Sequence, residues 1–311
     1  MSEKIATRVA YGKALAEIGK NENIVVLDAD LSGSTKTDSF KKQYPERHFN
    51  IGIAEGNMMA VAAGMASCGK TVFASTFAVF AAGRAYDSIR NSIGYPHLNV
   101  KIGATHAGIT LGEDGASHQM VEDIALMRAI PGMTVISPAD AVSTNAMVKL
   151  AAEMYGPVYL RLGRLDVPVI YEAGTQFEIG KGNQLKDGKD ITIIATGFMV
   201  APALKAAEML KEDGVSARVI DIHTIKPIDS DIIIKAAKET GAIITCEEHN
   251  LFGGLGSAVS EVVVKNHPVP MEMVGIEDTF GESGKPIELV EKYGLTPENI
   301  YKKSKALLNR K

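Results

Sequence analysis

The chain of 311 residues is long enough for two domains of ordinary size, and its 46% apolar and 23% charged residues are typical of a globular protein. The formal net charge of −4 argues against a nucleic-acid-binding protein, whose basic face should show in the total. No apolar run approaches the roughly 18 residues of a membrane-spanning helix, and the N-terminal residues lack a signal-peptide core, so we expect a cytoplasmic protein.

Strand and helix patterns alternate through the first half of the chain. Helical periodicity or continuous small apolar residues predict helices over residues 6–18, 57–68, 76–91, 120–129 and 141–154, the last of them capped by the segment 137–140. Short β-rich runs predict strands over residues 24–27, 49–53, 71–74, 98–102, 134–136 and 157–162. Such alternation predicts a parallel sheet with helices on both of its faces.

The periodic pattern stops near residue 166 and resumes near residue 191. The stretch between contains glycine, charge and two short β-like pieces, which predicts a linker. Beyond it, strands are predicted over residues 191–195, 217–222, 242–246 and 271–276, and helices over 201–213, 231–240, 254–265, 286–293 and 297–309. We therefore expect an α/β protein of two domains, each a mostly parallel sheet flanked by helices: residues 1–170, a linker at 171–189 and residues 190–311.

The stretch THAGITLGEDGASHQ, residues 105–119, concentrates groups that can do chemistry. It holds His106 and His118 with the adjacent acids Glu113 and Asp114, and its glycines break helices and strands and let the backbone approach a ligand closely. It follows a predicted strand, so it is a loop at the carboxyl end of that strand, where open α/β sheets bind ligands. A glycine-rich surface loop is the alternative, but two histidines with a carboxylate pair favour a site.

Glu55 stands at a predicted strand-to-helix turn within the segment GIAEGN. Its neighbours are apolar, so we expect the carboxyl group to be buried. Burial raises the pKa of a glutamate and lets it donate a hydrogen bond at neutral pH. The alternative is a helix-terminal acid that the helix dipole favours, and the sequence leaves both interpretations open.

Three other features give weaker signals. The GEDG element with Asn145 is similar to the metal and diphosphate motif of thiamine enzymes, but glutamate interrupts the Gly-Asp-Gly and Asn145 falls inside a predicted helix, so we reject that interpretation. The GGxG at residues 253–256 precedes a helix and could serve helix packing or an anion. Cys68 and Cys246 match no metal-binding spacing and predict buried thiols in a reducing compartment.

Four motifs together resemble transketolase: THAGITLGEDGASHQ, GIAEGN, the ATR of residues 6–8 and the DADLSGS of residues 28–34. The first domain resembles the pyrimidine-binding domain of that family and the second its carboxyl-terminal domain, so the resemblance covers the whole chain. The sequence lacks the domain that holds the diphosphate and the metal of the cofactor. The resemblance therefore implies the carboxyl-terminal subunit of a split transketolase, an enzyme of the pentose phosphate pathway that transfers a two-carbon ketol unit between sugar phosphates.

The resemblance also implies cofactors and a partner. It implies thiamine diphosphate with Mg²⁺ or Ca²⁺, the metal being bound mainly by an N-terminal subunit that carries a Gly-Asp-Gly…Asn motif rather than by this chain. It implies a heterotetramer of the two subunits, with sugar phosphates as substrates and with neither nucleic acid nor membrane as a partner.

The family's site residues can be carried over to matching positions. Glu55 corresponds to the glutamate that hydrogen-bonds the aminopyrimidine ring and so helps to activate the thiazolium carbon. The other implied cofactor contacts are Asp30, Leu31, Phe77 and Phe80, although a role in the helix core is equally open for Phe77. The implied substrate contacts are Arg8, Ser34, His106, Asp114, His118 and Arg161, of which His106 and His118 also act in catalysis. Arg164 stays an alternative to Arg161, because the strand register is not fixed by the sequence.

Three other functions compete with a transketolase subunit. The beta subunit of a 2-oxo acid dehydrogenase has the same two-domain plan and a glutamate in a similar IAE context, but it is not expected to carry the two-histidine loop. Deoxyxylulose-phosphate synthase is normally one long chain. A regulatory or structural remnant should have lost its site residues, which are present here together. One departure is that Gly56 and Asn57 follow Glu55, where many relatives carry a histidine within two residues.

Overall fold

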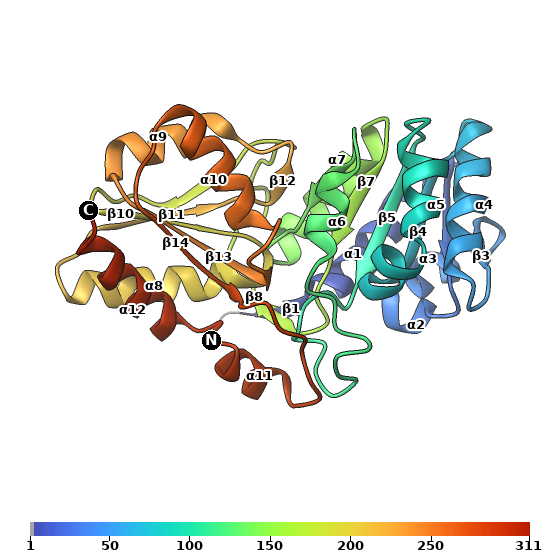
Figure 1. The fold of residues 1–311 in the computed structure, drawn as a ribbon. Coiled ribbons are helices and arrows are strands. Elements are labelled where there is room, and N and C mark those ends of the chain that lie inside the picture. Colours follow the sequence, from blue (N-terminus) through green and yellow to red (C-terminus); the bar gives the residue numbers. More distant parts are fainter. Residues whose placement is uncertain (1–2) are drawn as a thin grey trace.

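Two sheets of mostly parallel strands organise the molecule, and helices cover their faces (Figure 1). The structure is a computed structural model that describes residues 3–311. The larger sheet has the strand order β12-β6-β7-β5-β4-β2-β3 and the smaller one β14-β13-β10-β11-β9, while β1 (Lys4–Ala6) and β8 (Asp166–Pro168) form a separate antiparallel pair. This arrangement confirms the predicted α/β class.

The larger sheet comes mainly from the first half of the chain. Its strands are β2 (Ile24–Asp28), β3 (His48–Asn50), β4 (Thr71–Phe77), β5 (Val100–Thr105), β6 (Thr134–Ile136), β7 (Val158–Arg161) and β12 (Thr224–Lys226). Neighbouring strands are parallel except for β12, which runs antiparallel to β6. Because β12 lies far along the sequence, the second half of the chain supplies an edge strand of the first half's sheet.

Helices cover both faces of the larger sheet. They are α1 (Thr7–Ile18), α2 (Ser32–Thr35), α3 (Asp38–Gln43), the 3-10 turn η1 (Pro45–Arg47), α4 (Glu55–Ser67), the π-helical η2 (Val79–Arg84), α5 (Tyr86–Ser88), the π-helical η3 (Ile89–Gly94), α6 (Asp123–Ala129) and α7 (Ala141–Glu153). α1 packs on α3 and α7, whereas α4 packs on β4, α5, η2 and η3. Asp140 caps α7 through the backbone N–H and the hydroxyl of Ser143, which fixes the predicted start of that helix.

The smaller sheet is built from the second half of the chain. Its strands are β9 (Asn183–Lys186), β10 (Ile191–Ala195), β11 (Ala217–Asp221), β13 (Ile243–Asn250) and β14 (Met271–Ile276). The helical segments are η4 (Gly197–Met199), α8 (Val200–Glu212), α9 (Ser230–Thr240), α10 (Leu255–Asn266), α11 (Pro286–Lys292) and α12 (Pro297–Leu308). α8 and α12 lie together on one face and α9 and α10 on the other (Figure 1). β9 pairs antiparallel with β11, so part of the predicted linker belongs to this sheet.

Several element boundaries differ from the sequence prediction. β4 does not end at residue 74, because its ladder with β5 continues to the pair Phe77–Thr105. The helix predicted over residues 76–91 is therefore absent as a single element, and η2, α5 and η3 replace it. The helix predicted from Met120 begins only with α6, because Met120 pairs with Gly108 in an antiparallel bridge.

Two general predictions concern the thiols and the membrane. Cys246 is buried in β13 as predicted, but Cys68 is exposed, because it follows the last residue of α4 at the end of that helix. The prediction of a buried thiol is thus wrong for Cys68, and both cysteines are free. Within residues 3–311, no helix is both long and apolar enough to cross a membrane.

Candidate active site

The predicted site residues gather where neighbouring parallel strands of the larger sheet end. Asp30 follows β2, Phe77 ends β4 and His106 follows β5, while Glu55 begins α4 after the edge strand β3. The carboxyl ends of parallel strands lie at one edge of a sheet, so residues far apart in the sequence meet there. Arg8 reaches the same edge from the first turn of α1.

A row of four rings forms the wall of this site. The Phe77 ring stacks on the His106 ring with centroids 3.8 Å apart, and on the Phe80 ring with centroids 5.7 Å apart and planes inclined by only 7°. The edge of the row is His118, whose ring meets Phe80 in a T-shaped contact at 5.5 Å. Because Phe77 is 7% exposed and ends a strand, the alternative that it fills a helix core does not fit the structure.

Glu55 is a buried carboxyl group, only 5% exposed, at the first position of α4. Within the described residues its side chain caps no backbone N–H, and its neighbour is Arg84, whose Nη1 lies 3.6 Å from Oε1. The Arg84 guanidinium in turn lies over the Phe80 ring, 4.3 Å from the centroid. Arg84 is not among the site residues predicted from the sequence, although its four-residue distance from Phe80 places the two side chains together on a helical segment.

His106 is held in a defined, uncharged state. Its backbone is left-handed with φ of 59°, its Nδ1 lies 2.8 Å from the Thr105 hydroxyl, and its Nε2 lies 3.2 Å from Arg8 Nη1. Burial, with the charges of Arg8, Arg164 and Lys36, lowers the pKa of His106 to about 3. The imidazole is therefore neutral at physiological pH.

Arg8 and Ser34 meet beside this histidine. Arg8 Nη1 donates a hydrogen bond of 2.9 Å to the Ser34 carbonyl oxygen, and among the described residues the buried Arg8 Nε has no partner. Burial, followed by the charge of Arg164, lowers the pKa of Arg8. Positive charge thus accumulates at this point of the site: within residues 3–311 no acid is in hydrogen-bond contact with Arg8, although the charge of Asp166 partly offsets that of Arg164.

Asp30 and Leu31 shape the loop after β2. Asp30 has a left-handed φ of 63° and exchanges two hydrogen bonds with Asn50: its N–H donates to Asn50 Oδ1 at 3.0 Å, and its Oδ1 accepts from Asn50 Nδ2 at 2.8 Å. The Leu31 N–H donates to the buried Asp28 carboxylate. The same Asn50 oxygen accepts from Gly52, so the β2 loop is tied to the turn that leads to Glu55.

Arg161 is buried in the fold, whereas Arg164 and Asp114 are more accessible. Arg161 is 6% exposed, its Nε donates to both Asp123 carboxylate oxygens, and its Nη2 donates to the carbonyl oxygens of Met120 and Glu248. These protein acceptors engage the Nε and Nη2 groups of the guanidinium inside the fold. Arg164 is the partly exposed arginine whose charge acts on His106 and Arg8, while Asp114 is exposed on the loop.

The glycine-rich helix start at residues 253–256 holds an internal acidic group. The buried Glu247 carboxyl group accepts the backbone N–H groups of Leu255 and Gly256 at 2.7 and 2.8 Å. A side chain at Gly254 would run into that carboxyl group. Burial raises the pKa of Glu247 to about 7.

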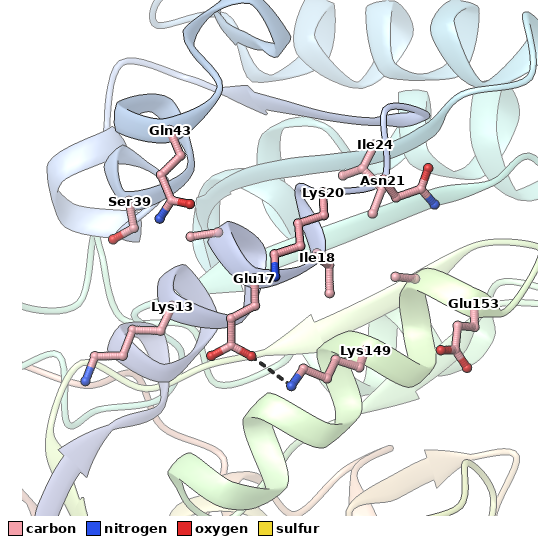
Figure 2. A pocket seen from close by; sticks show the side chains of 12 residues that line it. Lys13, Glu17, Ile18, Lys20, Asn21, Ile24, Ser39, Gln43, Lys149 and Glu153 are labelled. Atoms are coloured by element: carbon pink, nitrogen blue, oxygen red, sulfur yellow. Dashed lines mark ion pairs between the residues drawn. The ribbon is translucent and has the colours of Figure 1, made fainter.

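A large groove lies apart from the site. It has a volume of about 1210 Å³ and lies between α1, α3 and α7, where Lys149 pairs with Glu17 at 2.8 Å (Figure 2). It opens beside Ile24 at the amino end of β2, whereas the site residues lie at the carboxyl ends of the strands. Asn145, excluded above as a diphosphate ligand, donates to Glu17 on this side.

Comparison with known proteins decides the family. The family model for the transketolase pyrimidine binding domain matches residues 3–169, and the model for the transketolase C-terminal domain matches residues 180–300. The chain belongs to the transketolase family. A Methanocaldococcus jannaschii protein assigned as a transketolase C-terminal section is 55% identical over 300 residues, which cover 95% of this chain and 94% of that protein.

Members of the family match this chain over different shares of their own length. A solved structure titled a split gene transketolase, inactive beta4 tetramer, has a TM-score of 0.91 and 57% identity and covers 98% of both chains. The transketolase of Rattus norvegicus is 39% identical and covers 100% of this chain, which spans only 50% of that protein. The chain thus spans about half the length of the Rattus norvegicus relative, and the family assignment favours transketolase over the 2-oxo acid dehydrogenase alternative.

Proposed function

We propose that this chain is the subunit of a thiamine-diphosphate-dependent transketolase that supplies the aminopyrimidine and sugar-phosphate contacts. The reaction is the transfer of a two-carbon ketol unit between sugar phosphates. The observation that carries the proposal is the buried Glu55 carboxyl, which Arg84 links to the stacked Phe77 and Phe80 rings. We also propose a cytoplasmic location and a place in the pentose phosphate pathway.

The residues fit the pyrimidine half of thiamine diphosphate. A planar aminopyrimidine needs an aromatic wall and a partner for a ring nitrogen, and the two phenylalanines and Glu55 offer both. When bound, thiamine diphosphate supplies carbanion-stabilising chemistry. Glu55 holds a proton at the ring nitrogen, and Asp30 and Leu31 border the cofactor from the β2 loop.

The cationic side of the site fits a sugar phosphate. Arg8 and Arg164 form the phosphate clamp, because arginine binds phosphate through charge-assisted hydrogen bonds, with Ser34 and His118 beside them. We assign this role to the partly exposed Arg164 rather than to the buried Arg161, whose Nε and Nη2 donate to acceptors inside the fold. The neutral His106 exchanges hydrogen bonds with sugar hydroxyl groups, and Asp114 and His118 complete the substrate contacts.

A partner chain completes the enzyme. We propose that an N-terminal subunit with a Gly-Asp-Gly…Asn motif holds the diphosphate and Mg²⁺ or Ca²⁺, and that two copies of each chain form a heterotetramer. Relatives of this length support the proposal: one from Phocaeicola vulgatus is named as a subunit of an apulose-4-phosphate transketolase and is 41% identical over 96% of this chain. The division into residues 1–170, 171–189 and 190–311 is part of the same proposal.

Reconstitution tests the proposed function. The chain and its N-terminal partner are purified separately, combined with thiamine diphosphate and Mg²⁺, and assayed for ketol transfer from a ketose phosphate to an aldose phosphate. We expect transfer by the mixture and none by either chain. Absence of transfer with every sugar pair, together with decarboxylation of a 2-oxo acid, would instead support the 2-oxo acid dehydrogenase alternative.

A further inference from the structure

The loop between β5 and α6, residues 106–122, is held from the second half of the chain. It carries His106, Asp114 and His118, all part of the proposed site. Its base closes through the bridge between Gly108 and Met120, and its far side lies against residues 281–286. The loop therefore rests on a surface that the first half of the chain does not provide.

Glu248 of β13 makes the central contact with this loop. Its carboxyl group, in a residue 3% exposed, accepts the Thr110 backbone N–H through Oε1 at 2.8 Å. A side chain at Gly108, where φ is +79°, would run into the same carboxyl group. The carboxyl group thus lies directly on the loop backbone, in a contact that only glycine permits.

Gln119 makes a second tie at the other end of the loop. It is 5% exposed, and its Nε2 donates to the Glu282 carbonyl oxygen at 2.9 Å. The same nitrogen donates to the carbonyl oxygens of Ile109 and Gly112 within the loop at 3.2 and 3.3 Å. One amide group therefore joins both arms of the loop to the second half of the chain.

Buried polar groups fix the position of Glu248 itself. Arg161 Nη2 donates to the Glu248 carbonyl oxygen at 2.8 Å, and Arg161 Nε pairs with Asp123 at 2.9 Å. Tyr159 donates its hydroxyl to the same Asp123 carboxylate at 2.9 Å. A buried pair of this kind adds little net stability, but a satisfied network favours one arrangement over others.

We propose that Glu248 is a positioning residue, through which the C-terminal half fixes the loop that carries His106 and His118. The proposal rests on the proposed function of that loop. Thr110 lies four positions from His106, so removal of the acceptor leaves a buried N–H unsatisfied and lets the segment between them shift. A displacement of about 1 Å in a site can cost about 10²-fold in rate.

The test compares two substitutions of Glu248 in the assembled enzyme. Glu248→Ala removes the acceptor, whereas Glu248→Gln keeps an oxygen that can accept the Thr110 N–H. Glu261→Ala is the matched control, because Glu261 also joins the two halves, through Arg128 at 3.0 Å, but does not touch the loop. We measure hydrogen exchange of the amides at residues 108–111, kcat and KM for ketol transfer, and thiamine diphosphate affinity by calorimetry.

We expect Glu248→Ala to speed exchange at residues 108–111 and to lower kcat/KM by about 10- to 100-fold. Cofactor affinity should change less than kcat/KM, because Glu55, Phe77 and Phe80 lie outside the loop and only the His106 and His118 rings packed against the two phenylalanines lie in it. Glu248→Gln should show the amide exchange of the parent at residues 108–111 and the kcat/KM of the parent. If Glu248→Ala matches the parent, or if Glu248→Gln loses as much as Glu248→Ala, Glu248 does not position the loop.

A second variant covers the case in which Glu248→Ala does not fold. Gln119→Ala removes the other tie and should speed exchange around residues 109–112 while lowering kcat/KM in the same direction. Parent-like exchange and kinetics in that variant would also overturn the proposal. The proposed function and the role of Glu248 fail in different experiments. An inactive parent complex overturns the proposed function. Hydrogen exchange of the Thr110 amide still decides whether Glu248 holds the loop.

Discussion

Glu55 shows how one residue can be interpreted only together with its neighbours. Its carboxyl group is 5% exposed and makes no capping hydrogen bond among the described residues, but its place in the first turn of α4 fits the helix-dipole alternative as well. The charged group near Glu55 is the Arg84 guanidinium, a planar group with N–H donors that lies over the Phe80 ring. The next two predictions separate the role of Glu55 from that of Arg84.

Glu55→Gln should nearly abolish activation of the cofactor while leaving the fold intact. Glutamine is almost isosteric with a protonated glutamate, but it cannot share a proton with the ring nitrogen. We expect proton–deuterium exchange at the thiazolium carbon, measured in the enzyme assembled with its partner, to fall by about 10²- to 10⁴-fold. Exchange as fast as in the parent would remove Glu55 from the mechanism.

Arg84→Met should raise the affinity of the assembled enzyme for thiamine diphosphate by about two- to fivefold. The 59% exposed Arg84 side chain pairs with Glu55 and covers Phe80, the two groups that we assign to the aminopyrimidine, and an exposed cation–π contact is worth about 0.5–1 kcal/mol. Calorimetry measures the change, with the exposed Arg90→Met as control. A weaker affinity would make Arg84 a cofactor ligand instead of a competitor.

Arg8→Ala and Arg164→Ala should discriminate between phosphorylated and non-phosphorylated donors. A hydrogen bond to a charged group contributes about 1.5–3 kcal/mol, so each variant should lose about 10- to 100-fold in kcat/KM with a phosphorylated donor. The loss should be much smaller with a donor that lacks the phosphate. Equal losses with both donors would show that these arginines do not bind phosphate.

At the scale of elements, β5 joins the core to the site. It ends at Thr105, immediately before His106, and near its start Lys101 is completely buried. Lys101 Nζ donates to the carbonyl oxygens of Met154 and Gly156 at 2.7 and 2.6 Å, so the strand is tied to the end of α7. Burial lowers the pKa of Lys101 to about 7.

This buried lysine makes stability depend on pH in a defined direction. The unfolded chain keeps the lysine protonated up to about pH 10.5, while the folded chain releases the proton near pH 7. Between these values the unfolded state binds more protons, so the free energy of unfolding rises with pH. Urea unfolding of the parent and of Lys101→Met should show the parent gaining stability relative to the variant from pH 7 to 9. A pH-independent difference would contradict this.

At the scale of the whole molecule, the two halves are joined by more than the linker. β12 completes the larger sheet, Ser137 donates its N–H to the His223 carbonyl oxygen at 2.8 Å, and Glu248 holds the loop at residues 106–122. Lys226 Nζ donates to the carbonyl oxygens of Arg128 and Ile130 at the C-terminal end of α6. The halves therefore share a sheet edge and a buried polar network.

Cutting the linker should not separate the halves. Residues 172–174 are exposed, so a protease site introduced there can be cleaved in the native protein. We expect the cleaved chain to elute from gel filtration with the uncut chain, and to separate only under denaturing conditions. Two native species of smaller size would show that the contacts across the boundary are weak.

The sequence alone determined the features that depend on local pattern. Alternating strands and helices gave the α/β class, because the period of apolar residues reflects the element they form. The glycine-rich loop with His106 and His118, and the turn at Glu55, were visible because turn residues and polar groups follow directly after apolar runs. The family motifs rest on the same short segments.

Only the tertiary structure decided which of these groups meet. Arg161 and Arg164 are equivalent in the sequence, but the first ends a buried strand against Asp123 and the second lies beyond it. The contacts of Arg84 with Glu55 and of Glu248 with Thr110 join residues far apart in the chain. Neither periodicity nor motif spacing encodes such contacts, because they arise only when packed elements bring distant side chains to one edge of the sheet.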